Sequence, residues 1–378
     1  MTNHVSQSTM HDFDLHGSVG IRLLNATDQD VRAVARQLGP IQKPLTRAPD
    51  ITIRFVERLA LSGPLRYLGL NDTAFTDDAF LILRSKHKTQ ARVQIPLAQV
   101  GQPCEILCEH GAPAVPLLIA IINLTALHKG VLPLHASAFC YNGKGVLTTG
   151  WSKGGKTETL LAFTAQGATY IGDEWVYLGD GGRQMHGIPE PLRIWDWHLA
   201  ELPQYWAHVG PQDRTRLRLL RNLAYVAERT ADVGSKSIAL PAKVMRRLGG
   251  LLKEQLYVDM APQKIFGEGH EATAAPLDYL FFVASHATQD ICVEPIAPST
   301  VAERMVFSLQ YEQLPLLEIY YKFRFAFPEL RNELLEESEA CQRELLRKML
   351  AGKPAHALYH PYPVKIPDLF DALVGLIG

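Results

Sequence analysis

One pattern near the middle of the chain constrains the fold more than any other. Residues 150–157 read Gly-Trp-Ser-Lys-Gly-Gly-Lys-Thr and fit G-x-x-x-x-G-K-[ST], the pattern of a P-loop. Glycines let the backbone turn so that successive N–H groups point at phosphate oxygens, and the loop must open into a helix whose N-terminus faces the anion. Residues 145–149 predict a short buried strand before the loop, and residues 158–165 predict an apolar-faced helix after it.

The side chains of this motif have separate tasks. Lys156 would reach the β- and γ-phosphates of a nucleoside triphosphate, and the Thr157 hydroxyl would ligate Mg²⁺. ATP and Mg²⁺ are therefore the expected cofactors, although no motif for the base separates ATP from GTP. The residues that we expect to bind the nucleotide are Gly150, Ser152, Lys153, Gly154, Gly155, Lys156, Thr157 and Glu158.

An Asn-Gly pair predicts a tight hairpin just ahead of the loop. Asn142 and Gly143 lie between two apolar runs, and both positions of such a turn favour positive φ. The register that follows places His135 opposite Gly150, the first residue of the loop. A lone histidine in a strand is usually structural, but this one would lie where a metal ion and a γ-phosphate meet. We therefore include His135 among the candidate catalytic and metal-binding residues.

Two acidic residues follow the next predicted strand. Residues 168–172 predict a short strand that ends in Asp173 and Glu174. A carboxylate at the end of a strand beside the P-loop strand is where such folds place a Mg²⁺ ligand. The alternative is that the two residues begin an exposed turn. We take Asp173 as a metal ligand and Glu174 as a second catalytic candidate, and a Pro- and Gly-rich loop then brings Arg193 back near the sheet.

Composition bounds the class of protein. A net charge of −1 gives no overall field that would attract nucleic acid or an anionic membrane. Residues 1–16 lack the apolar stretch of a signal peptide, and the apolar run at 115–124 is too short to cross a bilayer. We expect a cytoplasmic protein. Cys104, Cys108 and His110 have metal-ligand residue types but no second ligand pair, so we expect thiols that bind no metal.

Periodicity divides the chain into four regions within an α/β fold that is α+β overall. We expect a disordered tail at 1–12, an α+β region at 13–129, a P-loop core at 130–295 and a mainly helical region at 296–378. Strands are predicted at 15–24, 50–56, 79–84, 90–96, 104–108, 235–240 and 277–284. Helices are predicted at 28–38, 112–129 and 328–349. We interpret Arg214, Arg216, Arg218 and Arg221 as a solvated helix face rather than a substrate site.

Three segments in combination carry a family resemblance. They are residues 134–138 (Leu-His-Ala-Ser-Ala), the loop with its Gly-Lys-Thr-Glu end at 155–158, and residues 171–174 (Ile-Gly-Asp-Glu). Together they resemble the HPr kinase/phosphorylase family, in its C-terminal kinase domain, and more distantly the phosphoenolpyruvate carboxykinases. The resemblance covers about residues 130–195 of the chain.

The resemblance implies a P-loop core of the HPr kinase and carboxykinase type. It implies that Thr157 and Asp173 hold Mg²⁺, that Asp173 also acts as base toward an acceptor hydroxyl, and that His135 lies beside the metal or the transferred phosphate. Arg193 would match the arginine that follows these segments in the family. HPr kinases are oligomers, so assembly into a homo-oligomer stays open.

These observations favour an ATP-dependent kinase. With Mg²⁺, it would transfer the γ-phosphate to a hydroxyl of a protein serine, a peptide or a small molecule. One alternative is a nucleotide-gated binding or regulatory module without catalysis. Another is a carboxykinase-like enzyme, which needs further basic residues to hold an organic acid. Arg84, Lys86 and Lys129 are the candidates for that role.

Overall fold

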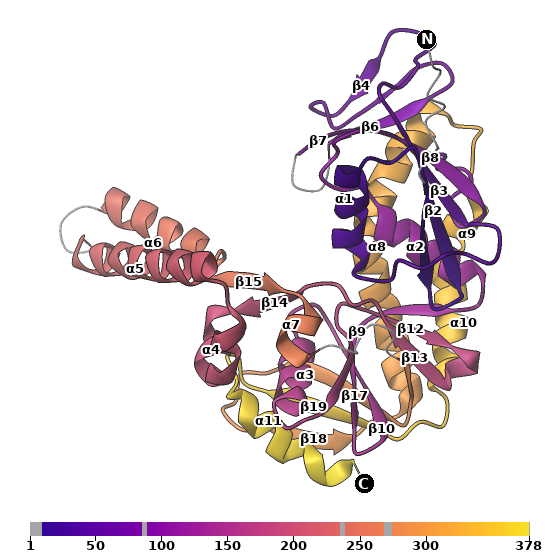
Figure 1. The fold of residues 1–378 in the computed structure, drawn as a ribbon. Coiled ribbons are helices and arrows are strands. Elements are labelled where there is room, and N and C mark those ends of the chain that lie inside the picture. Colours follow the sequence, from indigo (N-terminus) through magenta and orange to yellow (C-terminus); the bar gives the residue numbers. More distant parts are fainter. Residues whose placement is uncertain (1–9, 85–88, 235–238, 268–273, 378) are drawn as a thin grey trace, which may run out of the picture.

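The protein has a mixed α/β fold built on two large sheets. The structure is a computed structural model that describes residues 10–84, 89–234, 239–267 and 274–377. Figure 1 shows the two sheets in separate halves of the molecule, a long helix running between them, and a pair of helices that projects to one side. In the described ranges, no helix is both long and apolar enough to cross a membrane.

The first sheet has eight strands and takes up the first third of the chain. Its order is β1-β2-β3-β8-β7-β6-β5-β4, with β2, β3 and β8 mutually parallel and the other neighbours antiparallel. The strands are β1 (Met10–Leu15), β2 (Val19–Leu24), β3 (Ile51–Val56), β4 (Arg66–Leu68), β5 (Thr73–Phe75), β6 (Phe80–Arg84), β7 (Gln90–Gln94) and β8 (Cys104–Glu109).

The N-terminal prediction is wrong in two respects. Met10 to Asp12 belong to β1 rather than to a disordered tail, while residues 1–9 of that prediction lie outside the described residues. The single strand expected at 15–24 is instead the end of one hairpin strand and all of the next. His16 and Gly17 separate them, because both adopt positive φ (49° and 75°) and so turn the chain back.

Two helices cover this sheet. Helix α1 (Asp28–Leu38) has the predicted bounds and begins with a capping box between Thr27 and Asp30. Helix α2 (Leu118–His128) begins six residues later than predicted. The apolar pattern does extend back to Ala112, but Leu117 has a φ of 61°, which a right-handed helix does not allow. The start of α2 therefore follows the backbone and not the hydrophobic pattern.

The second sheet is centred on the predicted hairpin. Its order is β16-β13-β12-β9-β10-β17-β19-β18, and β11 also pairs with β9; β10, β17 and β19 are parallel. The strands are β9 (Leu132–Tyr141), β10 (Lys144–Thr149), β11 (Thr169–Gly172), β12 (Trp175–Gly179), β13 (Gln184–Gly187), β16 (Ala274–Pro276), β17 (Tyr279–Ser285), β18 (Cys292–Pro295) and β19 (Ala355–His360).

The predicted hairpin register is confirmed. Lys144 pairs with Tyr141 and Thr149 with Ala136, so His135 comes next, opposite the start of the glycine-rich loop. One part of the prediction is wrong: β11 lies beside β9, not beside β10, whose other neighbour is β17. Strand β9 is long enough to pair with β11 at one end and with β12 at the other, and this creates the corner at which the acidic residues lie.

The remaining elements surround the second sheet. They are α3 (Lys156–Thr164), α4 (Asp196–Glu201), α5 (Pro211–Gly234), α6 (Ala239–Lys253), α7 (Pro262–Phe266), α8 (Pro298–Ala326), α9 (Glu333–Glu336), α10 (Ser338–Leu350), α11 (Ile366–Leu373), the two-stranded ribbon β14 (Leu192–Trp195) and β15 (Tyr257–Met260), and three short 3₁₀ turns at 180–182, 203–208 and 374–376.

Two predicted elements, one strand and one helix, need correction. Residues 235–238 of the strand expected at 235–240 lie outside the described residues, and Ala239 and Leu240 begin helix α6. The single helix expected at 328–349 is divided into α9 and α10, because Asn332 caps the N-terminus of α9 with its side chain and the helix restarts at Ser338.

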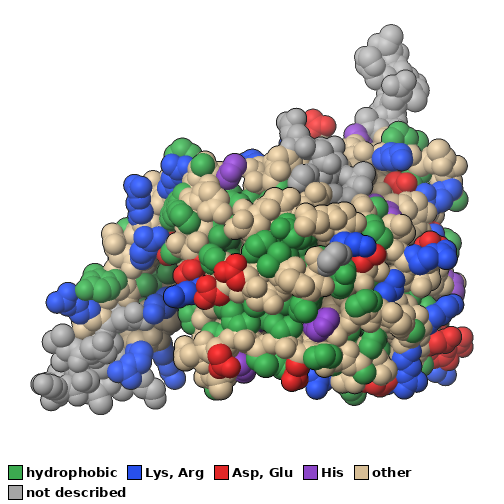
Figure 2. Space-filling view, turned by 90° about the horizontal axis from the view of Figure 1, so that it is seen from below, with side chains coloured by type: hydrophobic (Ala, Val, Ile, Leu, Met, Phe, Trp, Pro, Cys, Tyr) green, Lys and Arg blue, Asp and Glu red, His purple; other side chains and the backbone are tan. Residues whose placement is uncertain are grey.

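Helices α5 and α6 form the projecting arm in Figure 1. Figure 2 shows basic side chains gathered toward this arm on the left of the molecule. Two arginines at its base have structural contacts. Arg214 donates to the Val209 and Trp206 carbonyls at 2.9 and 2.7 Å, and Arg221 forms an ion pair with Asp196. These contacts fix the root of the arm and need no substrate to explain them.

Helix α8 contacts both halves of the molecule. Near its start, the Met305 sulfur accepts a hydrogen bond from Thr149 of β10 at 3.0 Å. Near its end, the Phe323 ring packs edge-on against Phe80 of the first sheet, with centroids 5.7 Å apart. A residue of α8 can therefore contact the second sheet, while packing against the first sheet fixes the position of the helix.

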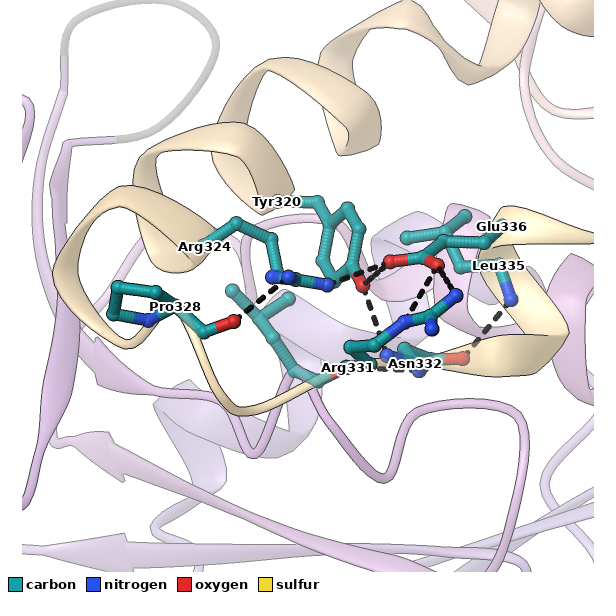
Figure 3. Close-up of polar contacts among 8 residues, drawn as sticks. Tyr320, Arg324, Pro328, Arg331, Asn332, Leu335 and Glu336 are labelled. Atoms are coloured by element: carbon teal, nitrogen blue, oxygen red, sulfur yellow. Dashed lines mark hydrogen bonds and ion pairs between the residues drawn. The ribbon is translucent and has the colours of Figure 1, made fainter.

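A polar network fastens the far end of α8 (Figure 3). The Tyr320 hydroxyl donates to Glu336 at 2.6 Å and accepts from the Asn332 backbone N–H at 2.8 Å. The Asn332 side chain in turn donates to the carbonyls of Leu97 and Val100 in the first half of the chain. Buried polar groups that are satisfied in this way fix an arrangement more tightly than apolar packing alone.

Candidate functional site

The glycine-rich loop between β10 and α3 lies on the ends of two parallel strands. A side chain at Gly150 would place its Cβ 2.2 Å from the Val283 carbonyl of β17. At Gly155 a Cβ would lie 2.0 Å from Nε2 of His360, at the end of β19. The φ values of Gly150, Lys153 and Gly155 are 154°, 61° and 108°. The loop requires these glycines both for their conformation and for the close approach to the strands.

The helix expected after the loop begins at Lys156, two residues earlier than predicted. The Lys156 side chain is 6% exposed, and its ammonium donates to the Trp151 carbonyl at 3.0 Å across the loop. Burial lowers the pKa of Lys156, against the attraction of Glu174 and Asp173. An ammonium held at a loop and a helix N-terminus can neutralise an anion bound there.

Asp173 lies where β11 ends. Its two carboxylate oxygens are 3.0 and 3.2 Å from the Thr157 hydroxyl, on the first turn of α3. Burial, followed by the nearby charge of Glu174, raises the pKa of Asp173 to about 7. The two side chains predicted to share a metal ion are therefore brought together, and both offer the hard oxygen ligands that Mg²⁺ prefers.

Glu174 turns the chain from β11 into β12. Its φ is 67°, and its carbonyl accepts from the Ala136 N–H at 3.1 Å. This turn directs the side chain back to His135, whose Nε2 lies 2.9 Å from Glu174 Oε2. The hydrogen bond to His135 is the main cause that lowers the pKa of Glu174, and the charge of Arg193 adds to it.

The structure adds Glu312 of α8 to this group. Its Oε1 lies 3.0 Å from His135 Nδ1, within ion-pair distance but outside the angles of a hydrogen bond. Burial would lower the pKa of His135, but the contacts with Glu174 and Glu312 outweigh it and raise that pKa. Sequence analysis missed Glu312 because it lies on a long helix without a motif, far from the loop in sequence.

A fourth carboxylate, Glu190, lies near the acidic pair. Its Oε1 is buried and has no hydrogen-bond partner. Burial, and then the charges of Glu174 and Asp173, raise the pKa of Glu190 well above its usual range. Asp173, Glu174 and Glu312 thus lie around Lys156 and His135, and Glu190 lies close to the acidic pair. The Asp173 side chain is buried, that of Glu174 is 53% exposed, and a cation that enters this group would stabilise the ionised carboxylates.

The other predicted site residues lie around this centre, and most of them have contacts of their own. Glu158 points into the protein, where its Oε1 lies 3.2 Å from His198 Nε2, and Lys153 is exposed. Ser152 is half-buried in the loop. Arg193 of β14 pairs with Asp259 at 3.3 Å and lies over the Tyr257 ring at 4.1 Å, yet its charge reaches Glu174.

Arg84, one of the basic residues considered for an organic acid, lines a cavity beside this centre, and the other described residues considered for other chemistry lie elsewhere. Lys129 pairs with Asp50 at 2.6 Å beside the first sheet, and Lys86 lies outside the described residues. Cys104 and Cys108 are buried free thiols, and burial raises their pKa values to about 11 and 12. Within the part of the chain that the structure describes, no three His, Cys, Asp or Glu side chains are arranged to hold a metal ion by themselves.

Comparison with models of known protein families found no match, and comparison with curated protein sequences found none either. Because a fold alone does not define an activity, the functional argument rests on the geometry and chemistry of this site.

Proposed function

We propose that this chain is an ATP-dependent phosphotransferase that moves the γ-phosphate to an acceptor hydroxyl. One observation carries the proposal. The Lys156 ammonium, the Thr157 hydroxyl and the Asp173 carboxylate meet at the N-terminus of α3, behind a loop whose glycines are required by their contacts with β17 and β19. This is the core of the P-loop arrangement that the resemblance to HPr kinases implies.

Mg²⁺ suits the residues of this site. Thr157 and Asp173 would hold it, and a small number of protein oxygens is normal for Mg²⁺, which takes its other ligands from phosphates and water. The unpartnered Glu190 oxygen and the excess of carboxylates are the features that favour a bound cation. When bound, Mg²⁺ would neutralise charge on the β- and γ-phosphates.

The chain's own residues would supply the rest of the catalysis. Backbone N–H groups of the loop and the Lys156 ammonium would bind and orient the phosphates, which is most of what phosphoryl transfer requires. Asp173 would accept the proton of the acceptor hydroxyl. Glu174 is the weaker base, because its hydrogen bond to His135 lowers its pKa. His135, with its raised pKa, would place a positive charge beside the transferred phosphate.

The contacts of His135 also weigh against the alternatives. A module that only binds a nucleotide has no need of a histidine held between Glu174 and Glu312. A carboxykinase-like enzyme needs basic residues for an organic acid, and Lys129 is held by Asp50 instead.

Isothermal titration with Mg²⁺ and a non-hydrolysable ATP analogue tests the proposal. We expect the wild type to bind only with Mg²⁺, and Asp173→Ala to bind at least about tenfold more weakly, since about 1.4 kcal/mol corresponds to tenfold. Asp180→Ala, which removes an exposed carboxylate, is the matched control and should bind as the wild type does. A wild type that binds no nucleotide under these conditions would contradict the proposal.

A transfer assay tests catalysis separately from binding. Lys156→Ala should abolish transfer of labelled phosphate from ATP while the circular dichroism spectrum stays that of the wild type. Retained turnover in this variant would remove the P-loop assignment, because no other ammonium in the described site takes the place of Lys156.

A further inference from the structure

A large cavity adjoins the candidate site on the side of the first sheet. It has a volume of about 1020 Å³ and lies between β6, α2, α8 and the face of β9 and β12 that carries Pro133 and Trp175. Two of its lining residues contact His135: the Glu312 carboxylate at 3.0 Å, and the Trp175 ring with centroids 5.9 Å apart. The cavity and the phosphate site therefore share a wall.

The walls of the cavity are mainly apolar. Their apolar side chains include those of Ile82, Val115, Leu117, Ile119, Leu314 and Leu317. Burial of apolar surface is therefore the main interaction that the cavity offers, at about 25 cal/mol for each Å² removed from water. An occupant with a long apolar body fits this lining.

Several of the polar side chains on these walls already have partners within the protein. Gln37 makes two hydrogen bonds to the backbone of Val115, at 3.0 and 2.8 Å. Asn123 accepts from the Tyr177 hydroxyl at 2.6 Å, and Gln342 accepts from Gln310 at 2.9 Å. A polar occupant that bonds these atoms would displace a hydrogen bond that each already makes, which reduces the gain from polar contacts there.

The charges on the walls also exclude an anionic occupant. Lys322 pairs with Glu318 at 2.8 Å, and Arg84 lines the cavity together with the opposite charge of Asp72. Glu312 adds a further negative charge beside His135. The lining thus has no excess of positive charge that would attract a phosphate or a carboxylate.

We propose that this cavity binds the phosphate acceptor, and that the acceptor is a small molecule with one hydroxyl on an uncharged, largely apolar body. The inference rests on the proposed function. The hydroxyl oxygen forms a bond to the γ-phosphorus of ATP, and the bond from that phosphorus to the bridging β–γ oxygen breaks. The hydroxyl proton passes to Asp173, and ADP leaves. A cavity of this volume matches the sites of small molecules.

A fluorescent alcohol tests binding in the cavity. The probe is 6-(dansylamino)hexan-1-ol, which has a terminal hydroxyl on an uncharged apolar body and brightens in apolar surroundings. We expect Leu314→Arg and Ala120→Phe, which obstruct the lining, to weaken binding by at least about tenfold. Leu219→Arg is the matched control, because Leu219 and Leu314 are similarly exposed, at 59% and 52%, and Leu219 lies on the arm.

The result that supports the proposal is binding by the wild type and Leu219→Arg, loss in both cavity variants, and transfer of labelled phosphate from ATP to the probe. Equal binding by all four proteins, or none by the wild type, would overturn it. Probe binding without transfer, by a protein that also binds Mg²⁺ and ATP, would overturn the acceptor assignment. Probe binding by a protein that binds no ATP would instead show that the proposed function is wrong.

Discussion

Two buried aspartates, one beside each sheet, have opposite electrostatic environments. Asp30 of helix α1, beside the first sheet, is fully buried, yet its carboxylate accepts from His110, from the Thr27 side chain and from the Gly111 N–H at 2.7–2.9 Å. Burial alone would raise its pKa, but these bonds lower it. Asp173 of the second sheet is 4% exposed, and burial together with Glu174 raises its pKa to about 7.

This difference separates a structural carboxylate from a candidate functional one. Around Asp30, the hydrogen bonds come from groups of the folded chain itself, so the protein alone satisfies the carboxylate. Around Asp173, the Thr157 hydroxyl is the hydrogen-bond partner, and the strongest charge effect comes from Glu174, which has the same sign. A bound cation or proton would therefore stabilise this site. Perturbed carboxylates of this second kind are typical of functional sites.

The largest effect should come from the structural aspartate. Asp30→Ala removes the capping box of α1 and leaves His110 and the Gly111 N–H without their acceptor. We expect the free energy of unfolding in urea to fall by about 3–5 kcal/mol, as it does when one partner of a buried pair is removed. Asp28→Ala changes an exposed aspartate on the same helix and should lose far less. If both variants lost the same amount, the contrast between the two sheets would be wrong.

Replacing Asp173, the candidate functional aspartate, should raise the free energy of unfolding rather than lower it. Asp173 binds its proton more tightly in the folded protein than the usual aspartate pKa of 3.8 implies, so its ionisation costs stability as pH rises from about 4 to about 7. Asp173→Asn should therefore be more stable than the wild type at pH 8 in EDTA, by about 1–2 kcal/mol.

Urea unfolding at several pH values measures this difference. The stability advantage of Asp173→Asn should shrink as the pH falls from about 7 toward 4, because the folded wild-type carboxyl becomes protonated over this range. Asp180→Asn, at an exposed site, should show no such trend. If Asp173→Asn were less stable than the wild type at pH 8, Asp173 would be a structural carboxylate like Asp30.

The sequence predicted those parts of the site that depend on local rules. The Asn142-Gly143 turn determines the register of β9 and β10, and thereby the position of His135. The glycines and the presence of a helix directly after the loop follow from the backbone requirements of the motif, although that helix begins two residues earlier than predicted. In and beside the first sheet, the alternation of Ile51, Ile53 and Phe55 and the periodicity of residues 28–38 were sufficient for the same reason.

The rest depends on contacts between distant segments, which one sequence does not contain. Glu312 reaches His135 only because α8 is packed against both sheets, and Glu190 is buried beside Asp173 by a loop with no regular pattern. Strand β11 was placed beside the wrong neighbour, because its pairing with β9 depends on the length of β9. The start of α2 was missed since a single positive φ at Leu117 overrides an apolar run.

The smallest predicted effect is a change in the pKa of His135, and it tests whether Glu312 of α8 takes part in the candidate site. Glu312→Gln removes one of the two carboxylates that raise the pKa of His135, so that pKa should fall. Glu174→Gln should lower it further, because the hydrogen bond to Glu174 is the larger contribution. NMR titration of the His135 ring, assigned with His135→Gln, measures both. Glu318→Gln, on the same helix but paired with Lys322, is the control and should leave the titration unchanged. If the His135 pKa were unaltered in Glu312→Gln, Glu312 would have only a structural role, and of the two carboxylates Glu174 alone would raise the pKa of His135.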